Sequence, residues 1–179
     1  MKKLFAIAIA VSLAGSAMAA GSVGFEWGTN FYKPSAGGGK ASNGTNFLLS
    51  WNLDSDLSLG VYTETSLIAV NNTAPAPVAC TDNLTVSAIQ VMKGVVKNVQ
   101  IGLNIGSGTV AGLGGATNLI GETKPLVDVV GEVTILSGTG EKVSGNLRAM
   151  AAARFLNTNA GINPKLDGIN LGLGVQVMF

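Results

Sequence analysis

The sequence predicts an all-β protein, an eight-stranded antiparallel up-and-down transmembrane β-barrel. Three observations predict it: an export signal at the N-terminus, segments in which apolar and polar residues alternate, and connections that alternate in length. The composition agrees, because the chain is 47% hydrophobic and only 12% charged, whereas about 25% charged residues is usual for a globular domain. A charge-poor chain without a long apolar run fits a barrel whose lipid-facing residues are interleaved with polar ones.

The N-terminus has the organisation of a secretory signal peptide. Lys2 and Lys3 precede an apolar run over residues 4–14, and the small residues Ala17-Met18-Ala19 follow it, in the A-x-A pattern of a cleavage site. The run is too short for a membrane helix, which takes about 20 residues; an uncleaved anchor is the alternative. We therefore expect residues 1–19 to be removed by cleavage after Ala19 and residues 20–179 to form one barrel domain.

The last segment shows the strand pattern most clearly. Its odd positions are apolar and its even positions are small or polar, as expected of a strand with one face toward lipid. The apolar positions are Ile169, Leu171, Leu173, Val175, Val177 and Phe179. Seven earlier segments are predicted as strands, and they begin near Val23, Phe47, Leu57, Leu84, Val99, Val127 and Leu147. Two of them are ambiguous: the facing of residues 84–92 is unclear, and residues 147–156 are rich enough in Ala to form a helix.

The connections between these segments alternate in length. Long ones cover about residues 33–43, 71–82, 107–123 and 157–168, and short ones about residues 54–56, 94–98 and 138–142. Bacterial outer-membrane barrels have short periplasmic turns and longer extracellular loops. An even number of strands then places both termini on the short-turn side, in the periplasm.

These features resemble the small eight-stranded outer-membrane barrels of the OmpA and OmpX type. The resemblance covers the whole chain after the signal, and it is architectural. It implies a location in the bacterial outer membrane, with outer-membrane lipid as a partner. It also implies that Leu171, Leu173, Val175, Val177 and Phe179 form the C-terminal signal read by the barrel-assembly machinery. The chain departs from that class in its aromatic content of only 6% and in having no Tyr in the last strand.

Six charged residues fall on the predicted inward face of the strands. They are Glu26, Glu64, Asp128, Glu132, Arg148 and Arg154. An eight-stranded barrel is just wide enough to be filled by its own side chains, and a buried charge without a partner is strongly destabilising. The pattern therefore favours a salt-bridge plug in which each arginine bridges acids on neighbouring strands, with an ion pathway as the alternative.

Residues that could carry catalysis are scarce. The chain has no His and a single Cys, Cys80, which we expect in an outer loop. Membrane hydrolases generally use a His base, and zinc sites need His or Cys clusters. Asp128 and Glu132 are four positions apart on one strand, about 13 Å, which is too far for a joint carboxylate site. We therefore expect no enzyme activity, cofactor or metal, and the net charge of +1 supplies no basic face for nucleic acid.

Three functions are compatible with the sequence. The prediction is a barrel with a structural or surface-interaction role, exerted through its extracellular loops, whose partner the sequence does not identify. The first alternative is a small porin or channel for ions or small solutes, for which eight strands leave little room. The second is a soluble periplasmic β-protein with its apolar faces packed inward.

Overall fold

The computed structural model describes residues 23–34, 42–53, 56–71, 79–112, 122–140, 143–156 and 167–179. The predicted signal peptide, residues 1–19, lies outside these ranges, as do most residues of the long connections at one end of the barrel. Across the described ranges, no helix is long and apolar enough to cross a membrane.

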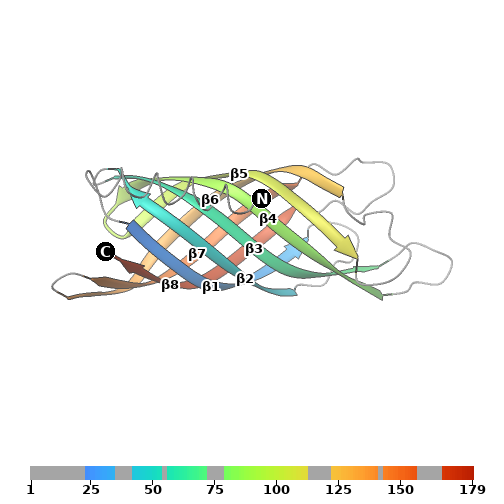
Figure 1. Ribbon diagram of the computed structural model, residues 1–179, viewed down its shortest axis with the longest axis horizontal. Coiled ribbons are helices and arrows are strands. Elements are labelled where there is room, and N and C mark those ends of the chain that lie inside the picture. The colour runs from blue at the N-terminus through green and yellow to red at the C-terminus, as the bar shows by residue number, and fades with distance from the viewer. Residues whose placement is uncertain are drawn as a thin grey trace, which may run out of the picture.

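Eight antiparallel strands form one closed barrel, and each strand pairs with its neighbour in sequence (Figure 1). Strand β8 pairs with β1 and closes the ring. The predicted eight-stranded up-and-down barrel is therefore confirmed. The strands are β1 (Val23–Pro34), β2 (Ser42–Asn52), β3 (Leu57–Asn71), β4 (Ala79–Val96), β5 (Val99–Gly112), β6 (Glu122–Thr139), β7 (Ser144–Leu156) and β8 (Gly168–Met178).

The strands β4, β5 and β6 extend further toward the long connections than the sequence predicts. Strand β4 begins at Ala79, so Cys80 is paired with Val70 in the sheet and not placed in a loop. Strand β5 continues to Gly112, which turns part of the predicted loop 107–123 into strand. These extensions contain Ser, Thr and Gly rather than a regular apolar face, so the period-two signal is absent there. The Thr residues nevertheless favour strands, and pairing with the neighbours continues.

Two ambiguities of the sequence are settled by the pairing. Residues 147–156 belong to β7, because they pair with β6 on one side and β8 on the other. In β4 the even-numbered residues point into the barrel and are buried, and they are Leu84, Val86, Ala88, Gln90 and Met92. The alternation of apolar and polar residues in their segments predicts that Val23 and Trp51 face outward, but both are buried. Leu48, an apolar residue that interrupts the alternation between Phe47 and Leu49, points inward and is buried as well.

Phe179 completes the seam between the first and last strands. Its amide donates to the Val23 carbonyl at 2.9 Å, and the Val23 amide donates to the Phe179 carbonyl at 3.3 Å. The Phe179 ring lies edge-on to Phe25, with ring centroids 6.2 Å apart. The seam is thus paired through to the last residue, so no strand edge is left open between β8 and β1.

The outer surface carries most of the predicted apolar rows. On β1 the Trp27 side chain is 65% exposed, and on β8 the Leu173 side chain is 55% exposed. The inner surface is filled, and it contains two apolar clusters as well as the charges. The larger one consists of Tyr32, Leu48, Tyr62, Leu84, Val86, Ala88, Leu126 and Leu156. The smaller one, here called the apolar layer, consists of Met92, Val130, Met150 and Ala152.

Placing a charge on the outer surface tests the facing of the strands. We expect Leu173→Arg, in the middle of β8, to lower the free energy of unfolding by about 2–4 kcal/mol, because the charge would lie near the bilayer midplane. The measurement is urea denaturation of protein folded in phospholipid vesicles. Thr139→Arg, at the exposed end of β6 beside a short connection, is the control and should change stability little. Equal effects at the two positions would contradict the assignment.

Candidate functional site

All six predicted inward charges are buried inside the barrel. Alternate residues of a strand share a face, so two acids of β6 and two arginines of β7 point into the same interior. The six form two groups. The central cluster consists of Arg154, Glu64 and Asp128, and the mouth cluster consists of Arg148, Glu26 and Glu132.

Arg154 joins opposite walls of the barrel. Its Nε and Nη2 donate to the two carboxylate oxygens of Asp128 on β6, each at 2.9 Å. Its Nη1 and Nη2 donate to the two carboxylate oxygens of Glu64 on β3, each at 2.8 Å. Strand β3 lies directly across the ring from β7. The fork geometry of the guanidinium suits two bidentate carboxylate pairs, and here it spans the whole lumen.

Neutral donors complete the central cluster. Glu64 also accepts hydrogen bonds from the Tyr62 hydroxyl and the Ser66 hydroxyl, both at 2.7 Å, and from Asn170 Nδ2 at 2.9 Å. Asn104 Nδ2 donates to Asp128 at 3.3 Å. Each carboxylate oxygen of the cluster therefore accepts at least one hydrogen bond, which is the condition for burying charge without a large penalty.

The ring of Tyr32 lies against the same guanidinium, with the Arg154 Cζ atom 5.1 Å from the ring centroid, within the range of a cation–π contact. Tyr32, Ser66 and Asn170 contact the charges of this cluster, although the charge pattern of the sequence does not point to them. A signal was present for Ser66, because it shares the inward face of β3 with Glu64 at a spacing of two.

The mouth cluster lies nearer the short connections. Arg148 Nη1 donates to Glu26 at 3.1 Å, and its Nη2 donates to Gln100 Oε1 at 2.7 Å and also pairs with Glu132. Gln90 Nε2 donates to Glu132 at 3.1 Å.

A glycine makes the Arg148–Glu26 contact possible. Strand β8 runs between β7 and β1, and a Cβ atom at Gly174 would lie 2.4 Å from Glu26 Oε1. Only a residue without a side chain leaves room there for Glu26 to reach Arg148.

The predicted bridging of acids on neighbouring strands is therefore only half correct. Each arginine of β7 does bind an acid of the adjacent strand β6. Its second acid comes from elsewhere: Glu26 lies two strands away, beyond β8, and Glu64 lies across the barrel. The reason is the small radius of the barrel, since the long arginine side chain reaches the far wall as readily as the next strand.

The apolar layer separates the two clusters. Met150 and Ala152 lie between Arg148 and Arg154 along β7, and Val130 lies between the two acids of β6. The described interior therefore alternates along the barrel between charged and apolar levels.

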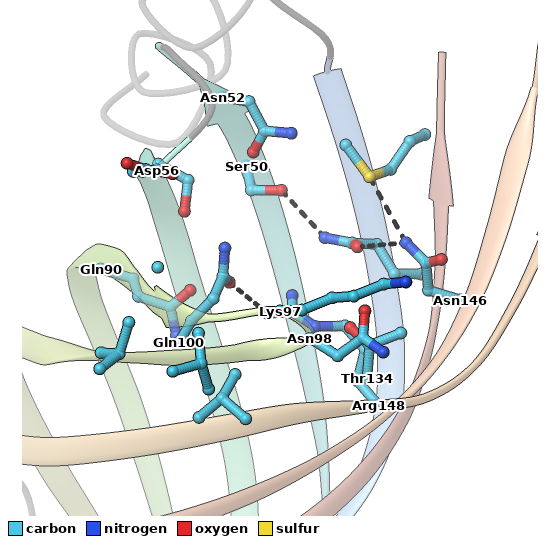
Figure 2. Close-up of a pocket in the computed structure, with 17 residues that line it drawn as sticks. Ser50, Asn52, Asp56, Gln90, Lys97, Asn98, Gln100, Thr134, Asn146 and Arg148 are labelled. Carbon is cyan, nitrogen blue, oxygen red and sulfur yellow. Dashed lines mark hydrogen bonds between the residues drawn. The ribbon is translucent and has the colours of Figure 1, made fainter.

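A polar vestibule opens at the short-turn end. It is a cavity of about 400 Å³, and Figure 2 shows Ser50, Asn52, Gln100 and Asn146 around it, with Arg148 of the mouth cluster on its lining. Its wall contains a chain of hydrogen bonds, from Asn146 Nδ2 to Gln176 Oε1 at 3.2 Å and from Gln176 Nε2 to Ser50 Oγ at 3.4 Å. The vestibule thus leads from the short connections to the mouth cluster.

In the interior, the two arginine side chains neutralise the buried carboxylates. Within the ranges that the structure describes, no group of three or more His, Cys, Asp or Glu could hold a metal ion. The carboxylates that could act as bases accept hydrogen bonds from arginine. The arrangement is that of a plug.

Comparison with known proteins gives a likeness of fold. No family model and no curated protein sequence matches the chain. Among solved structures, Neisserial surface protein A is 10% identical with a TM-score of 0.53, over 89% of this chain and 96% of that chain. Ail of Yersinia pestis is 11% identical with a TM-score of 0.49, over 89% and 99%. OprG of Pseudomonas aeruginosa is 10% identical with a TM-score of 0.48, over 89% and 96%.

All three are small eight-stranded outer-membrane barrels. The likeness to the Neisserial protein shows that this chain has the fold of such a barrel, and it confirms the resemblance inferred from the sequence.

Removing the guanidinium of the central cluster tests the plug. We expect Arg154→Met to lower the free energy of unfolding by about 3–5 kcal/mol, because Glu64 and Asp128 would remain buried without a cation. The triple variant that adds Glu64→Gln and Asp128→Asn removes both charges and should recover most of the loss. The free energy of unfolding of the wild type, of Arg154→Met and of the triple variant is measured by urea denaturation in phospholipid vesicles. A triple variant no more stable than Arg154→Met would show that the charges are not the cause.

Proposed function

We propose that this chain is an outer-membrane protein with a closed, non-conducting barrel that supports a structural or surface-interaction role. The connections at the long-loop end, which include residues 35–41, 72–78, 113–121 and 157–166, would carry the contacts with the outside. Function concentrates on loops that a rigid scaffold holds in place.

The observation that supports this function most is the occlusion of the lumen. The Arg154 and Glu64 side chains are fully buried where they meet across the barrel. Below them, the apolar layer lies between the central cluster and the vestibule. An ion entering from the vestibule would have to cross the mouth cluster, the apolar layer and the central cluster in turn. This favours a plugged barrel over a small channel.

The outer surface supports a lipid environment over the periplasm. Large apolar side chains are exposed on all eight strands, as at Phe25, Leu59, Ile89, Leu103, Val129, Phe155 and Leu173 and at Phe47 on β2. Exposed apolar area of this extent is unfavourable in water and matches the apolar band of an outer-membrane barrel. A soluble β-protein would instead bury these rows.

Planar-bilayer recording tests the closed barrel directly. We expect purified, folded protein to give no reproducible ion-sized current steps, because charged pairs and apolar side chains fill its interior. Insertion is checked independently by the heat-modifiable mobility of the unboiled protein on a detergent gel. Reproducible steps from protein that passes this check would replace the proposed role with that of a channel.

The positions of the two ends support a proposed orientation of the barrel in the membrane. Val23 and Phe179 are hydrogen-bonded to each other, so β1 begins and β8 ends at the same rim as the three short connections. In our proposal this rim faces the periplasm, residues 1–19 are removed after Ala19, and the barrel-assembly machinery reads the outward row of β8. That row consists of Leu171, Leu173, Val175 and Val177 on β8, and Phe179 follows it after the end of the strand.

Cysteine labelling of intact cells tests this orientation. In a Cys80→Ala background, Gly38→Cys places a thiol in a long connection, and Thr139→Cys places one at the short-turn rim. We expect a membrane-impermeant maleimide to label the first variant on intact cells and the second only after the outer membrane is permeabilised. The reverse pattern would show that the barrel is inserted the other way round.

A further inference from the structure

The central cluster carries a net negative charge. Glu64 and Asp128 are both bound by the single guanidinium of Arg154, so two carboxylates face one cation. All three side chains are fully buried, and the other buried charges of the described residues belong to the mouth cluster. Neutral donors such as the Tyr62 hydroxyl spread the negative charge but do not cancel it. Because an uncompensated charge is strongly destabilising in a protein interior, a further positive charge would stabilise the cluster.

Apolar side chains separate the central cluster from water at both ends. On the long-loop side, Leu126 lies beyond Asp128 on β6 and Leu156 lies beyond Arg154 on β7, and both leucines are buried. On the other side, the apolar layer separates the cluster from the vestibule. Arg148 of the mouth cluster, in contrast, lies on the vestibule wall, where water can screen its surroundings. The central cluster is therefore the one that needs a bound counter-charge.

Two buried amide oxygens beside Glu64 have no hydrogen-bond donor. Asn30 Oδ1 and Asn46 Oδ1 accept no hydrogen bond from any group in the ranges that the structure describes, although the two residues are only 3% and 5% exposed. Asn30 Nδ2 donates to Ser66 Oγ at 2.9 Å, and the Ser66 hydroxyl donates in turn to Glu64. Asn46 stands directly opposite Glu64 on β3. Both amides therefore lie around Glu64, each with an unused acceptor atom.

The two asparagines are diagonal neighbours on the inner face of β1 and β2. Asn30 stands opposite Gly44 and Asn46 stands opposite Gly28, and diagonal residues of adjacent strands are about 7–8 Å apart. The glycines leave room for the amide oxygens, because a Cβ atom at Gly28 would lie 2.5 Å from Asn46 Oδ1 and one at Gly44 would lie 2.5 Å from Asn30 Oδ1. One ion between the asparagine side chains could therefore contact both oxygens and lie next to Glu64.

The chemistry of these atoms selects the occupant. A water molecule could donate to both amide oxygens, but it would not offset the charge. A proton on a carboxylate would offset the charge, but it could serve only one of the oxygens. A monovalent metal cation does both, since carbonyl oxygens can replace the hydration shell of such an ion. A divalent ion fits less well, because it would make the cluster positive and because Ca²⁺ takes about 6–8 oxygen ligands.

A third amide oxygen, Asn104 Oδ1, also lacks a donor within the described ranges. Asn104 lies on β5, across the ring from β1, and its Nδ2 donates to Asp128. It is therefore on the opposite wall from Asn30 and is not part of the same site.

We propose that an alkali-metal cation, sodium or potassium, is bound between Asn30, Asn46 and Glu64. The two amide oxygens would coordinate the ion, and the negative charge of the central cluster would hold it. The ion would make the cluster neutral and would be enclosed in the plug, so it has a structural role and does not pass through the barrel. The lack of His and Cys clusters, from which we expect no metal, does not bear on a site whose ligands are amide oxygens.

Urea denaturation in phospholipid vesicles tests the site when sodium chloride is replaced stepwise by choline chloride at constant ionic strength. We expect the folding equilibrium constant of the wild type to rise with the sodium concentration, by about tenfold for each tenfold increase above the dissociation constant. Glu64→Gln makes the cluster neutral and should abolish this dependence. Glu26→Gln is the matched control, because it removes one of the two carboxylates bound to Arg148 in the mouth cluster, and it should keep the dependence.

Asn46→Leu tests the proposed ligand separately, because it removes an amide oxygen and leaves every charge in place. We expect its stability to respond to sodium only at higher concentrations than that of the wild type. Retained sodium is measured directly by atomic emission after folded protein is gel-filtered into choline chloride. The wild type and Glu26→Gln should retain a stoichiometric amount, and Glu64→Gln should retain none. Each variant is first shown to be folded by its heat-modifiable mobility.

Three outcomes would overturn the site. Equal stability of the wild type in sodium chloride and choline chloride would assign the amide oxygens to water. Stability in choline chloride that rises to the sodium level on acidification would assign the positive charge to a proton. A sodium dependence that both Glu64→Gln and Asn46→Leu retain in full would place the ion elsewhere. None of these outcomes bears on the proposed function, which is tested by bilayer recording and by labelling of intact cells.

Discussion

The contact of Arg154 with Glu64 and Asp128 is the interaction on which the rest of the interior depends. It links β7 to its neighbour β6 and to the opposite wall at β3, at a point where the side chains are fully buried. Two carboxylates share one guanidinium, so the remaining hydrogen-bond capacity must come from neutral donors, and Tyr62, Ser66 and Asn170 supply it. Because these donors arrive from β3 and β8, the cluster fixes the relative positions of strands that make no backbone contact. It also occupies the lumen, which is why we propose that the connections carry the function and that the barrel is not a transport pathway.

Adjacent residues of one strand lie in two different environments, the filled interior of the barrel and its apolar outer surface. Arg154 is buried among charges while Phe155, the next residue, is half exposed on the outside. Strand geometry allows this because successive side chains point to opposite faces. The interior also needs residues without side chains where large ones meet: a Cβ at Gly174 would collide with Glu26, and one at Gly108 would lie 2.8 Å from Leu156 Cδ1. Small barrels are filled by such alternation of large and small residues, so these glycines are part of the plug.

The strand count, most of the facing and the identity of the buried charges could be read from the sequence, because alternation is a local property. The partners of those charges could not, because the Arg154–Glu64 and Arg148–Glu26 contacts depend on how the sheet curves and closes. The facing of β4 was ambiguous for a different reason: Leu84 and Val86 are apolar and point inward, while Thr85 and Ser87 are polar and point outward, the reverse of the lower half of the strand. The same hydroxyl-rich stretches concealed the ends of β4, β5 and β6, since they carry no apolar face that a periodicity could detect.

Those hydroxyl-rich stretches also explain how a barrel with few aromatic residues can be positioned in a membrane. In the part of the chain that the structure describes, every exposed aromatic side chain belongs to β1, β2, β7 or the C-terminal residue, namely Phe25, Trp27, Phe31, Phe47, Phe155 and Phe179. Strands β3–β6 therefore lack the aromatic girdle that usually marks the interface. On these strands Thr65, Thr85, Thr109 and Thr123 stand opposite one another in a row, and on β4 and β5 this row lies on the long-loop side of the outward apolar residues. Threonine is a β-branched strand former that also carries a hydroxyl, so it can form hydrogen bonds at the membrane–water interface. A tyrosine or tryptophan would instead place an amphipathic ring there.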